Sequence, residues 1–414
     1  MRSDRLHATL CFDGSGERAV ARLGWDPRER HVVAEWEADF AARPLPLWPL
    51  RLKGYQSLLR PAGRAFGDLP ALFGDSLPDG WGRMLIDREL VARGLNRADL
   101  TDLQRLALVG ADGMGALVYR PEHPHQAERE ISLDWFDRLV PELDQGVGVD
   151  DLQRLRHMAG GSQGARPKFV AQISAGAKVL RSHRLKWQEG WRQVLIKRRA
   201  VLDPPGSVEA EAAYAAMARA AGITISRVDM LRASSGEAFF VTDRFDREGQ
   251  KRLHMQTVAA LLETDFRRNM GFDYQQLLKL VAVLTRDQRA VEEMFRRMVF
   301  NILALNRDDH LKNHAFLMRD SGEWQLAPAY DLSFSTGPGG EHSMLVAGEG
   351  RRPGQAAMER VAKTAGLRPK RALEVIGEVR SACAAWPGFA RETEVPEVLA
   401  GRIGAAMAEA AGWE

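Results

Sequence analysis

Residues 306–314 read NRDDHLKNH and directly follow an apolar stripe over 287–304. Apolar residues recur there at three- and four-residue spacing, which predicts one amphipathic helix ending at the polar stretch. Most residues of the stretch are Asp, Asn, His or Lys, types that gather where a chain does chemistry. Asp308 and Asn313 stand five residues apart, the interval at which phosphoryl-transfer loops place a proton-accepting acid and a Mg²⁺-binding amide. A solvated helix end with an Asx turn is the alternative.

The segment after this loop predicts a β-hairpin. Residues 315–318 and 324–326 have strand composition, and RDSG at 319–322 forms the turn between them. The hairpin leads to Asp331, and an acid in this place is the second metal ligand of kinase-type enzymes, bridging Mg²⁺ to the phosphates. A lone Asp in a turn is more often a cap, so the prediction depends on loop, hairpin and acid occurring in this order.

A glycine-rich run, GGSQGARPK at 160–168, precedes a predicted strand. Glycines let the backbone approach a polyphosphate and point its N–H groups at the phosphate oxygens. The candidate contacts are Gly161, Ser162, Gly164 and Lys168. Hairpin turns have the same composition, and the run lacks the Gly-Lys-Ser/Thr ending of a P-loop.

Lys197 ends an apolar strand and precedes a predicted helix over 208–221. A lysine leaving a buried strand, oriented by a helix glutamate, is the usual clamp on the α- and β-phosphates. Glu211 is the preferred glutamate because it lies deeper in the helix, whereas Glu209 belongs to the first turn and can offset the helix dipole. A surface lysine at a strand edge is the alternative.

The segment TDRFDR at 242–247 follows the second strand of another predicted hairpin and precedes the helical half. A hinge there would offer backbone groups to an adenine edge and Phe245 as an apolar surface. Its charges are also typical of a solvated linker, so both interpretations stay open.

The predicted elements form three consecutive parts. Residues 1–124 predict a β-rich N-terminal subdomain, helices and strands alternate over 125–248, and nearly everything over 249–414 is predicted to be helical. A β-rich half followed by a helical half is typical of a two-lobed enzyme, so the predicted fold class is α+β. The clearest predicted strands are 8–12, 19–23, 31–36, 168–173, 194–197, 226–231 and 238–242, and the clearest helices are 208–221 and 287–304.

Length and composition exclude several classes of protein. The 414 residues are 45% apolar, which excludes a disordered chain or a small stapled scaffold. The 58 basic residues nearly balance the 55 acidic ones, so no general attraction to nucleic acid or an anionic membrane is expected. Cys11 and Cys383 match no metal-ligand spacing, which indicates a reduced, intracellular chain without a disulfide framework. Residues 1–6 do not read as a signal peptide and no stretch spans a membrane, so a cytoplasmic location is expected.

These elements, in this order, resemble the HipA family of type II toxin–antitoxin kinases over most of the chain. The motifs that carry the resemblance are DxHxKN at 308–313, YDLS at 330–333, RFDR at 244–247 and GARPK at 164–168. LPDGWG at 77–82 and GADGMGAL at 110–117 are similar to signatures of the family's N-terminal subdomain. The resemblance implies a two-lobed protein-kinase-like fold with an extra β-rich N-terminal subdomain and an all-helical C-terminal lobe.

The resemblance also implies a bacterial Ser/Thr protein kinase that uses ATP and Mg²⁺. The roles it assigns are catalytic acid/base for Asp308, Mg²⁺ ligation for Asn313 and Asp331, phosphate clamping for Lys197, the hinge for Asp243 and Phe245, and ribose contact for Asp246. A serine of the glycine-rich loop is autophosphorylated in the family, and Ser162 is the candidate here. The candidate ATP-binding residues are together Gly161, Ser162, Gly164, Lys168, Lys197, Glu211, Asp243, Phe245, Asp246, His310 and Lys312.

By the same resemblance, a HipB-like helix-turn-helix antitoxin would neutralise the chain, and operator DNA would be met only through that partner. The implied protein substrates are aminoacyl-tRNA synthetases. Two other functions stay open: a small-molecule phosphotransferase on a kinase-like fold, and a non-catalytic module that binds nucleotide or DNA with its partner. The first usually has an acidic substrate pocket, and no acidic cluster follows Asp331. The second would lack Asp308, Asn313, Asp331 or Lys197, and all four are present.

Overall fold

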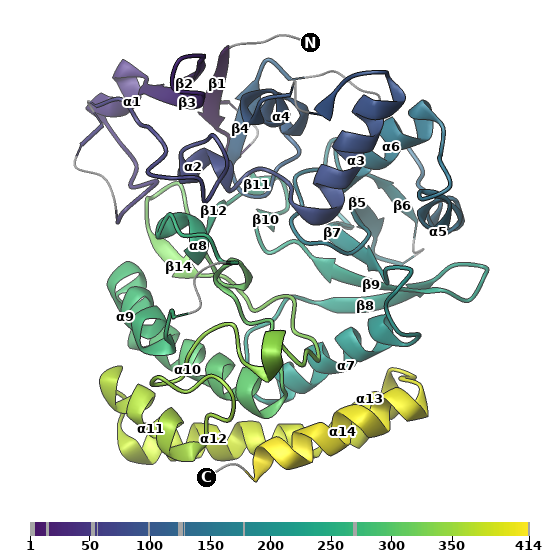
Figure 1. Ribbon diagram of the computed structural model, residues 1–414, viewed down its shortest axis with the longest axis vertical. Coiled ribbons are helices and arrows are strands. Elements are labelled where there is room, and N and C mark those ends of the chain that lie inside the picture. The colour runs from purple at the N-terminus through teal and green to yellow at the C-terminus, as the bar shows by residue number, and fades with distance from the viewer. Residues whose placement is uncertain are drawn as a thin grey trace. The chain divides into compact units, whose positions relative to one another are not determined.

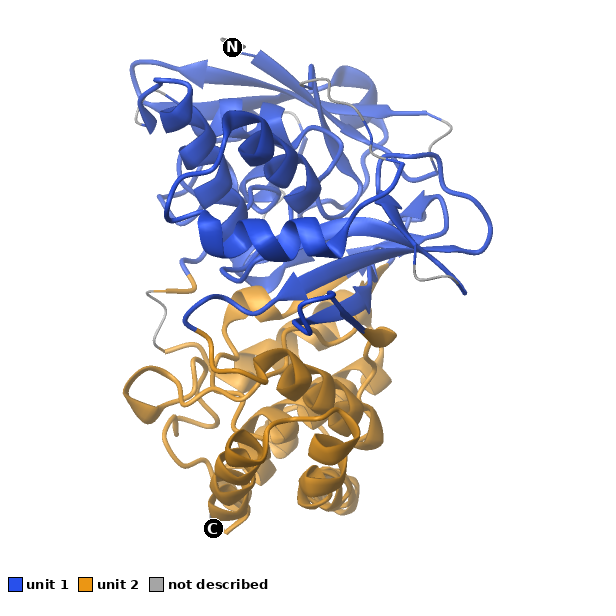
Figure 2. Cartoon of the chain, turned by 90° about the vertical axis from the view of Figure 1, so that its right-hand side faces the viewer, with its two compact units in different colours: residues 1–202, 231–265, 317–323 blue, residues 203–230, 266–316, 324–414 orange. Residues whose placement is uncertain are grey.

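The computed structural model describes residues 5–13, 16–50, 54–55, 57–97, 100–122, 127, 129–176, 179–267 and 271–412. Residues 1–4, part of the stretch tested for a signal peptide, lie outside these residues. The chain divides by its internal contacts into two compact units, coloured separately in Figure 2. Unit 1 comprises Met1–Leu202, Leu231–Asp265 and Leu317–Glu323, and unit 2 comprises Asp203–Met230, Phe266–Phe316 and Trp324–Glu414.

This division differs from the three consecutive parts predicted from the sequence. The segment Asp203–Met230 belongs to the helical unit although it lies inside the predicted part 125–248. A segment belongs to the unit whose elements pack around it, and those elements come from distant parts of the chain. The boundaries after residues 124 and 248 therefore stay predictions.

A four-stranded antiparallel sheet begins unit 1, with strand order β3-β2-β1-β4. Its strands are β1 (Arg5–Leu10), β2 (Arg18–Asp26), β3 (His31–Trp36) and β4 (Leu117–Arg120), so the three predicted N-terminal strands are confirmed. Leu10 of β1 lies opposite Leu117 of β4, which brings the GADGMGAL segment to this sheet. The helices of this region are α1 (Ala38–Ala42), α2 (Ala71–Gly74), α3 (Gly80–Ala92) and α4 (Asp102–Val109).

The second sheet of unit 1 has the order β6-β5-β7-β9-β8 and contains the strands predicted for the middle region. They are β5 (Lys168–Ser174), β6 (Leu180–Ser182), β7 (Trp191–Arg198), β8 (Val228–Arg232), of which Leu231 and Arg232 belong to this unit, and β9 (Ala238–Asp243). The short elements β10 (Arg247–Glu248), β11 (Lys251–Arg252), β12 (His254–Thr257) and α8 (Val258–Leu261) follow.

Helices α5 (Leu133–Glu142) and α6 (Val149–Ala159) complete the core of this sheet, and α6 also packs against α3 (Figure 1). The Phe136 ring of α5 lies 4.7 Å from the Phe169 ring of β5 and 6.2 Å from the Phe239 ring of β9, measured between centroids. All three side chains are fully buried. Aromatic contacts of this kind stabilise the sheet that carries Lys168 and Lys197.

Unit 2 is mainly helical. Its helices are α7 (Ser207–Ala220), α9 (Tyr274–Thr285), α10 (Gln288–Leu303), α11 (Gln355–Thr364), α12 (Pro369–Ala384), α13 (Trp386–Glu392) and α14 (Glu397–Ala411). The helix predicted over 287–304 is α10, which begins where the Asp287 carboxylate accepts a hydrogen bond from Arg289 N at 2.9 Å. Its apolar stripe is buried, and α10 packs against α9 and α12. Strands β13 (Ala315–Met318), of which Leu317 and Met318 belong to unit 1, and β14 (Trp324–Leu326) lie where the sequence predicts them.

Both cysteines are free thiols: Cys11 is half-buried and Cys383 is buried. In the described part of the chain, the helices are too short or too polar to cross a membrane.

Candidate functional site

The candidate residues belong to both units, and each group is described by itself. In unit 1 the glycine-rich loop 160–168 connects α6 to β5. Gly161 lies against Gly113, and a Cβ atom on Gly161 would stand 2.7 Å from the Gly113 Cα atom, so no side chain fits there. Gly164 has a φ of +102°, a conformation that favours glycine. These glycines are therefore required for the path of the loop itself.

Hydrogen bonds within unit 1 hold this loop. The backbone N–H of Gly164 donates to the Asp79 carboxylate, and Lys168 Nζ donates to the Gln163 carbonyl oxygen at 2.5 Å. Ser162 is 3% exposed, and its hydroxyl donates to the last carbonyl of α6 at 2.7 Å. Autophosphorylation of Ser162 stays a prediction, and it requires this loop to rearrange because the hydroxyl is buried.

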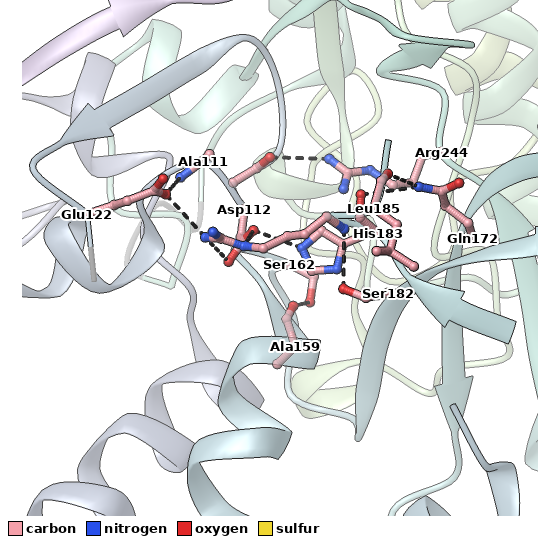
Figure 3. A network of polar contacts seen from close by, with 12 residues as sticks. Ala111, Asp112, Glu122, Ala159, Ser162, Gln172, Ser182, His183, Leu185 and Arg244 are labelled. Carbon is pink, nitrogen blue, oxygen red and sulfur yellow. Dashed lines mark hydrogen bonds and ion pairs between the residues drawn. The ribbon is translucent and has the colours of Figure 1, made fainter. Parts of the chain in front are cut away.

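A buried ionic network supports the start of the loop (Figure 3). Asp112 Oδ1 lies 2.8 Å from His183 Nε2 and 2.6 Å from Arg184 Nε. Burial alone would raise the pKa of the Asp112 carboxyl, but His183 and Arg184 lower it well below its usual value. The Asp112 carbonyl accepts a hydrogen bond from Gly161 N at 3.2 Å. The network therefore fixes the backbone from which the glycine-rich loop starts.

Two buried lysines lie opposite each other on neighbouring strands of unit 1. Lys168 of β5 pairs in register with Lys197 of β7, and the two residues are 3% and 6% exposed. Directly opposite residues of an antiparallel pair point to the same face, where like charges repel each other. Lys197 Nζ also lies 5.4 Å from the centre of the Phe240 ring. A polyphosphate bound at this face would stabilise both positive charges.

The predicted hinge begins at the end of β9. Asp243 is the last residue of that strand, and its carboxylate accepts a hydrogen bond from Arg192 Nη1 at 2.6 Å. Phe245 is half-buried. The structure thus fixes Asp243 within the sheet, and contacts of these two residues with a nucleotide stay predictions.

Asp246 has a structural role in unit 1. It is completely buried, and its carboxylate accepts hydrogen bonds from Arg244 Nη2 at 2.8 Å, Arg247 Nη1 at 2.5 Å and Gly115 N at 2.7 Å. Burial opposes its ionisation, but the two guanidinium groups hold the pKa of the carboxyl well below its usual value. The predicted contact with ribose stays a prediction, and these bonds instead join RFDR to the GADGMG segment.

In unit 2 the polar loop after α10 is anchored by Asp309. This residue is 1% exposed, and its carboxylate accepts hydrogen bonds from Tyr274 Oη at 2.8 Å and Ser343 N at 2.9 Å. Burial opposes ionisation, but His342, whose Nδ1 lies 3.2 Å away, and the Tyr274 hydroxyl lower the pKa of Asp309 below its usual value. The neighbouring Asp308 side chain is 61% exposed. One acid therefore fixes the loop while the other faces solvent.

The predicted residues of this loop lie together. Asn313 Nδ2 donates to the Asp308 carbonyl oxygen at 2.7 Å, which closes the five-residue interval and leaves the amide oxygen as the metal-binding atom. His310 Nε2 lies 3.8 Å from Asp308 Oδ1, and its ring lies 4.5 Å from that of Phe266. Lys312 Nζ lies 5.2 Å from the centre of the same ring.

Asp331 comes from a second segment that is bonded to the loop. It has a φ of +54°, an uncommon backbone conformation for a non-glycine residue that is found often at functional sites. Tyr330 Oη donates to the Lys312 carbonyl oxygen at 2.6 Å. This bond joins the residue before Asp331 to the residue before Asn313, so the two predicted metal ligands belong to segments that are held together.

The donor set fits a magnesium ion that arrives with a nucleotide. In the described ranges, no three His, Cys, Asp or Glu residues are arranged to hold a metal ion. Mg²⁺ in phosphoryl transfer is usually bound by one or two protein oxygens together with phosphates and waters. The Asp331 carboxylate and the Asn313 amide oxygen are donors of this kind.

Glu211 lies in α7 of unit 2 and is 7% exposed, whereas Glu209 in the first turn of that helix is half-buried. As the sequence indicates, Glu209 lies in the first turn of α7 and Glu211 lies beyond it, and Glu211 is the more buried of the two. Lys197 belongs to the other unit, so its predicted pairing with Glu211 stays a prediction.

Sequence reasoning missed the partners of Asp309. Tyr274 and His342 lie 35 and 33 residues away along the chain. Asp309 itself had a signal, because it is the second of two adjacent acids in a polar loop. No local pattern marks a tyrosine at the start of a helix or a histidine in a glycine-rich stretch as a partner of a buried carboxylate.

Two known protein families match this chain. The HipA-like C-terminal domain matches residues 160–386, more than half of the chain, and the HipA N-terminal domain matches residues 15–120. These two matches include the glycine-rich loop, the DxHxKN loop and the GADGMG segment.

Individual proteins are also similar to this chain. A Sinorhizobium fredii protein named "Putative kinase Y4mE" is 27% identical over 63% of this chain and 63% of its own length. A Haemophilus influenzae protein named "Putative kinase" is 33% identical over 27% of this chain and 35% of its own length. The solved HipA of Shewanella oneidensis MR-1, in complex with HipB and operator DNA, has a TM-score of 0.68 at 16% identity, covering 98% of this chain and 96% of that one. The mixed α/β fold is that of HipA, and the chain belongs to the HipA family.

Proposed function

We propose that the protein is a Ser/Thr protein kinase that transfers the γ-phosphoryl group of ATP to a protein hydroxyl. The observation that supports this most strongly is the loop after α10, where buried Asp309 fixes the backbone and leaves the Asp308 carboxylate exposed. Asn313 closes this loop by a hydrogen bond to the Asp308 carbonyl oxygen, and Tyr330 joins the Asp331 segment to it. A base and two oxygen ligands in this order are what phosphoryl transfer requires.

Each residue has one task in this proposal. Asp308 orients the attacking hydroxyl and accepts its proton as the new oxygen–phosphorus bond forms. Lys168 and Lys197 bind phosphate oxygens through their positive charge. Asn313 and Asp331 hold Mg²⁺, which neutralises charge on the phosphate oxygens when it is bound.

We extend the proposal to the partners of the chain. The solved Shewanella relative is complexed with HipB and operator DNA, so a HipB-like antitoxin is the proposed partner of this chain. The proposed protein substrates are of the aminoacyl-tRNA synthetase class, as the family resemblance implies. With 58 basic and 55 acidic residues, the chain has no excess of charge to bind many phosphates, so the proposed contact with operator DNA is made through the antitoxin.

Two variants test the assignment of roles. Asp308→Asn removes the base and should lower the transfer rate by about 10² to 10⁴ while Mg²⁺·ATP affinity stays nearly intact. Asp331→Asn removes a metal ligand and should weaken both transfer and Mg²⁺·ATP binding, measured by calorimetry. The exposed Asp320→Asn, an acid in the β13–β14 turn, is the control and should change neither quantity. Normal Mg²⁺·ATP binding by Asp331→Asn would overturn the assignment.

A further inference from the structure

A cavity of about 360 Å³ lies in unit 2, and neither the proposed catalytic residues nor the nucleotide-binding candidates line it. The residues that line it are Leu305, Arg307, Phe334, Ser335, Thr336, Gly339, Gly340, Arg351, Arg352, Ala406 and Glu409, and together they are called the arginine cavity below. Its volume falls within the range of small-ligand pockets, which is roughly 300 to 1,000 Å³.

The three arginines come from two segments that meet at this cavity. Arg307 Nη1 donates to the Thr336 carbonyl oxygen at 3.2 Å, and its Nη2 donates to the Arg351 carbonyl oxygen at 3.0 Å. Arg307 thus joins the segment that carries Thr336 to the segment that carries Arg351. Arg351 Nη2 donates to the Gly339 carbonyl oxygen at 3.2 Å. The guanidinium groups of Arg307 and Arg351 are thus positioned by backbone carbonyls.

The charge of the cavity favours an anion. The described lining residues carry three guanidinium groups and one carboxylate, that of Glu409, which lies 3.3 Å from Arg352 Nη2. The Glu341 carboxylate, outside the lining, lies 3.7 Å from Arg351 Nε. Burial lowers the pKa of the Arg307 guanidinium, Glu409 opposes this, and the positive charges of Arg351 and Arg352 lower the pKa as well. With the Glu409 and Glu341 carboxylates both counted, the three guanidinium groups still leave a net positive charge, which attracts an anionic ligand.

We propose that the arginine cavity binds a phosphate monoester. The three terminal oxygens of a monoester can accept from guanidinium groups on two sides, whereas a carboxylate or a phosphodiester offers only two charged oxygens. Two sources have this chemistry: a separate phosphorylated ligand, or this chain's own Thr336, which is exposed and lines the cavity.

Phosphorylation of Thr336 by this chain depends on the proposed kinase function, but the binding of phosphate in the arginine cavity does not. When Thr336 is phosphorylated, its hydroxyl oxygen bonds to the γ-phosphorus of ATP, the bond from that phosphorus to ADP breaks, and the hydroxyl proton passes to a base. Arg307 directly precedes Asp308, and Ser335 N donates to the Leu305 carbonyl oxygen at 3.0 Å. A phosphate held by Arg307 would therefore be coupled to the position of the catalytic loop.

Titration of the full chain with inorganic phosphate at constant ionic strength tests the site. The double variant Arg351→Ala/Arg352→Ala should bind phosphate at least about tenfold more weakly, because two charge-assisted contacts are lost. Arg360→Ala, which removes one exposed charge on α11 outside the cavity, should stay within about twofold of the wild type. Glu409→Gln should bind more tightly, since the competing carboxylate is gone. Unchanged phosphate affinity in the double variant, or an equal loss in Arg360→Ala, would overturn the proposal.

Two further measurements distinguish a separate phosphorylated ligand from phosphorylated Thr336, and a phosphate monoester from DNA. Mass spectrometry after incubation with ATP and Mg²⁺ shows phosphate on Thr336 if the chain supplies the monoester, and its absence alongside intact phosphate binding assigns the site to a separate ligand. A 20-base-pair DNA duplex should bind no more tightly than inorganic phosphate at physiological salt. Duplex binding that is tighter and lost in the arginine double variant would contradict a monoester site in favour of a phosphodiester backbone.

Discussion

Replacing Tyr274 by phenylalanine tests whether buried hydrogen bonds hold the catalytic loop. The hydroxyl of Tyr274 donates to Asp309 Oδ2 at 2.8 Å and accepts from Asn301 Nδ2 at 2.9 Å, and all three residues are buried. Loss of the neutral bond costs about 1 kcal/mol and loss of the bond to a carboxylate about 1.5 to 3 kcal/mol, because both partners stay buried. The variant should therefore lower the free energy of unfolding by roughly 3 kcal/mol.

The same variant should slow phosphoryl transfer. Asp309 fixes the loop that carries Asp308, so kcat should fall about tenfold, equivalent to about 1.4 kcal/mol, while KM for ATP changes little. Unfolding in urea and initial rates at saturating ATP measure the two effects. Tyr119→Phe is the control, because it loses a buried hydroxyl bonded to Ser76 Oγ at 2.7 Å far from this loop in sequence, and it should leave kcat unchanged. Wild-type stability and kcat in Tyr274→Phe would refute the anchoring role of Asp309.

Burial lowers the pKa of His254 to about 4, and as pH falls the unfolded chain, with a histidine pKa of 6.5, binds the proton first. Through His254 alone, the free energy of unfolding should therefore drop by about 1.4 kcal/mol per pH unit between 6.5 and about 4. The buried His314, whose pKa is also lowered to about 4, adds a similar slope, so His254→Gln should reduce the total slope by about 1.4 kcal/mol per pH unit in urea titrations. An unchanged slope would refute the contribution of His254. Gly161→Ala should destabilise the chain by about 1 to 3 kcal/mol, because its Cβ atom meets the Gly113 backbone, whereas Gly176→Ala, with open space, should not. Expression of the chain without an antitoxin should arrest growth, and Asp308→Ala should relieve the arrest. Continued arrest by a folded Asp308→Ala variant would show that the growth arrest comes from binding to a cell component rather than from phosphoryl transfer.

The elements of the fold that local patterns encode were predicted well. The apolar stripe over 287–304 became α10 (Gln288–Leu303), and the strands of the middle region became β5, β7 and β9. These elements can be recognised in the sequence, because burial of one face makes apolar residues recur at the spacing of a helix or a strand. The pairing of β4 with β1 and the membership of α7 in unit 2 were not predicted, because both depend on contacts between residues far apart in sequence.

In the candidate site, too, contacts between residues far apart in sequence were not predicted. Asp308 and Asn313 were found from their spacing, and the structure adds the hydrogen bond that closes this interval. The bonds of Tyr274 to Asp309 and of Arg244 to Asp246 were not predicted, since a buried carboxylate is identified only by what surrounds it after folding. For Asp246 the family resemblance implied a nucleotide contact, which stays a prediction, and the fold adds the bonds to Arg244, Arg247 and Gly115.

Transfer of label from γ-labelled ATP is the most direct test of the proposed activity. The full chain is incubated with Mg²⁺ and a cell extract, and labelled proteins are hydrolysed to identify the phosphorylated amino acid. We expect label on serine or threonine of a protein with the wild type, and a loss of at least about 10² in rate with Asp308→Asn at equal ATP binding. Label confined to small molecules, or equal protein labelling by Asp308→Asn, would contradict a Ser/Thr protein kinase that uses Asp308 as its base.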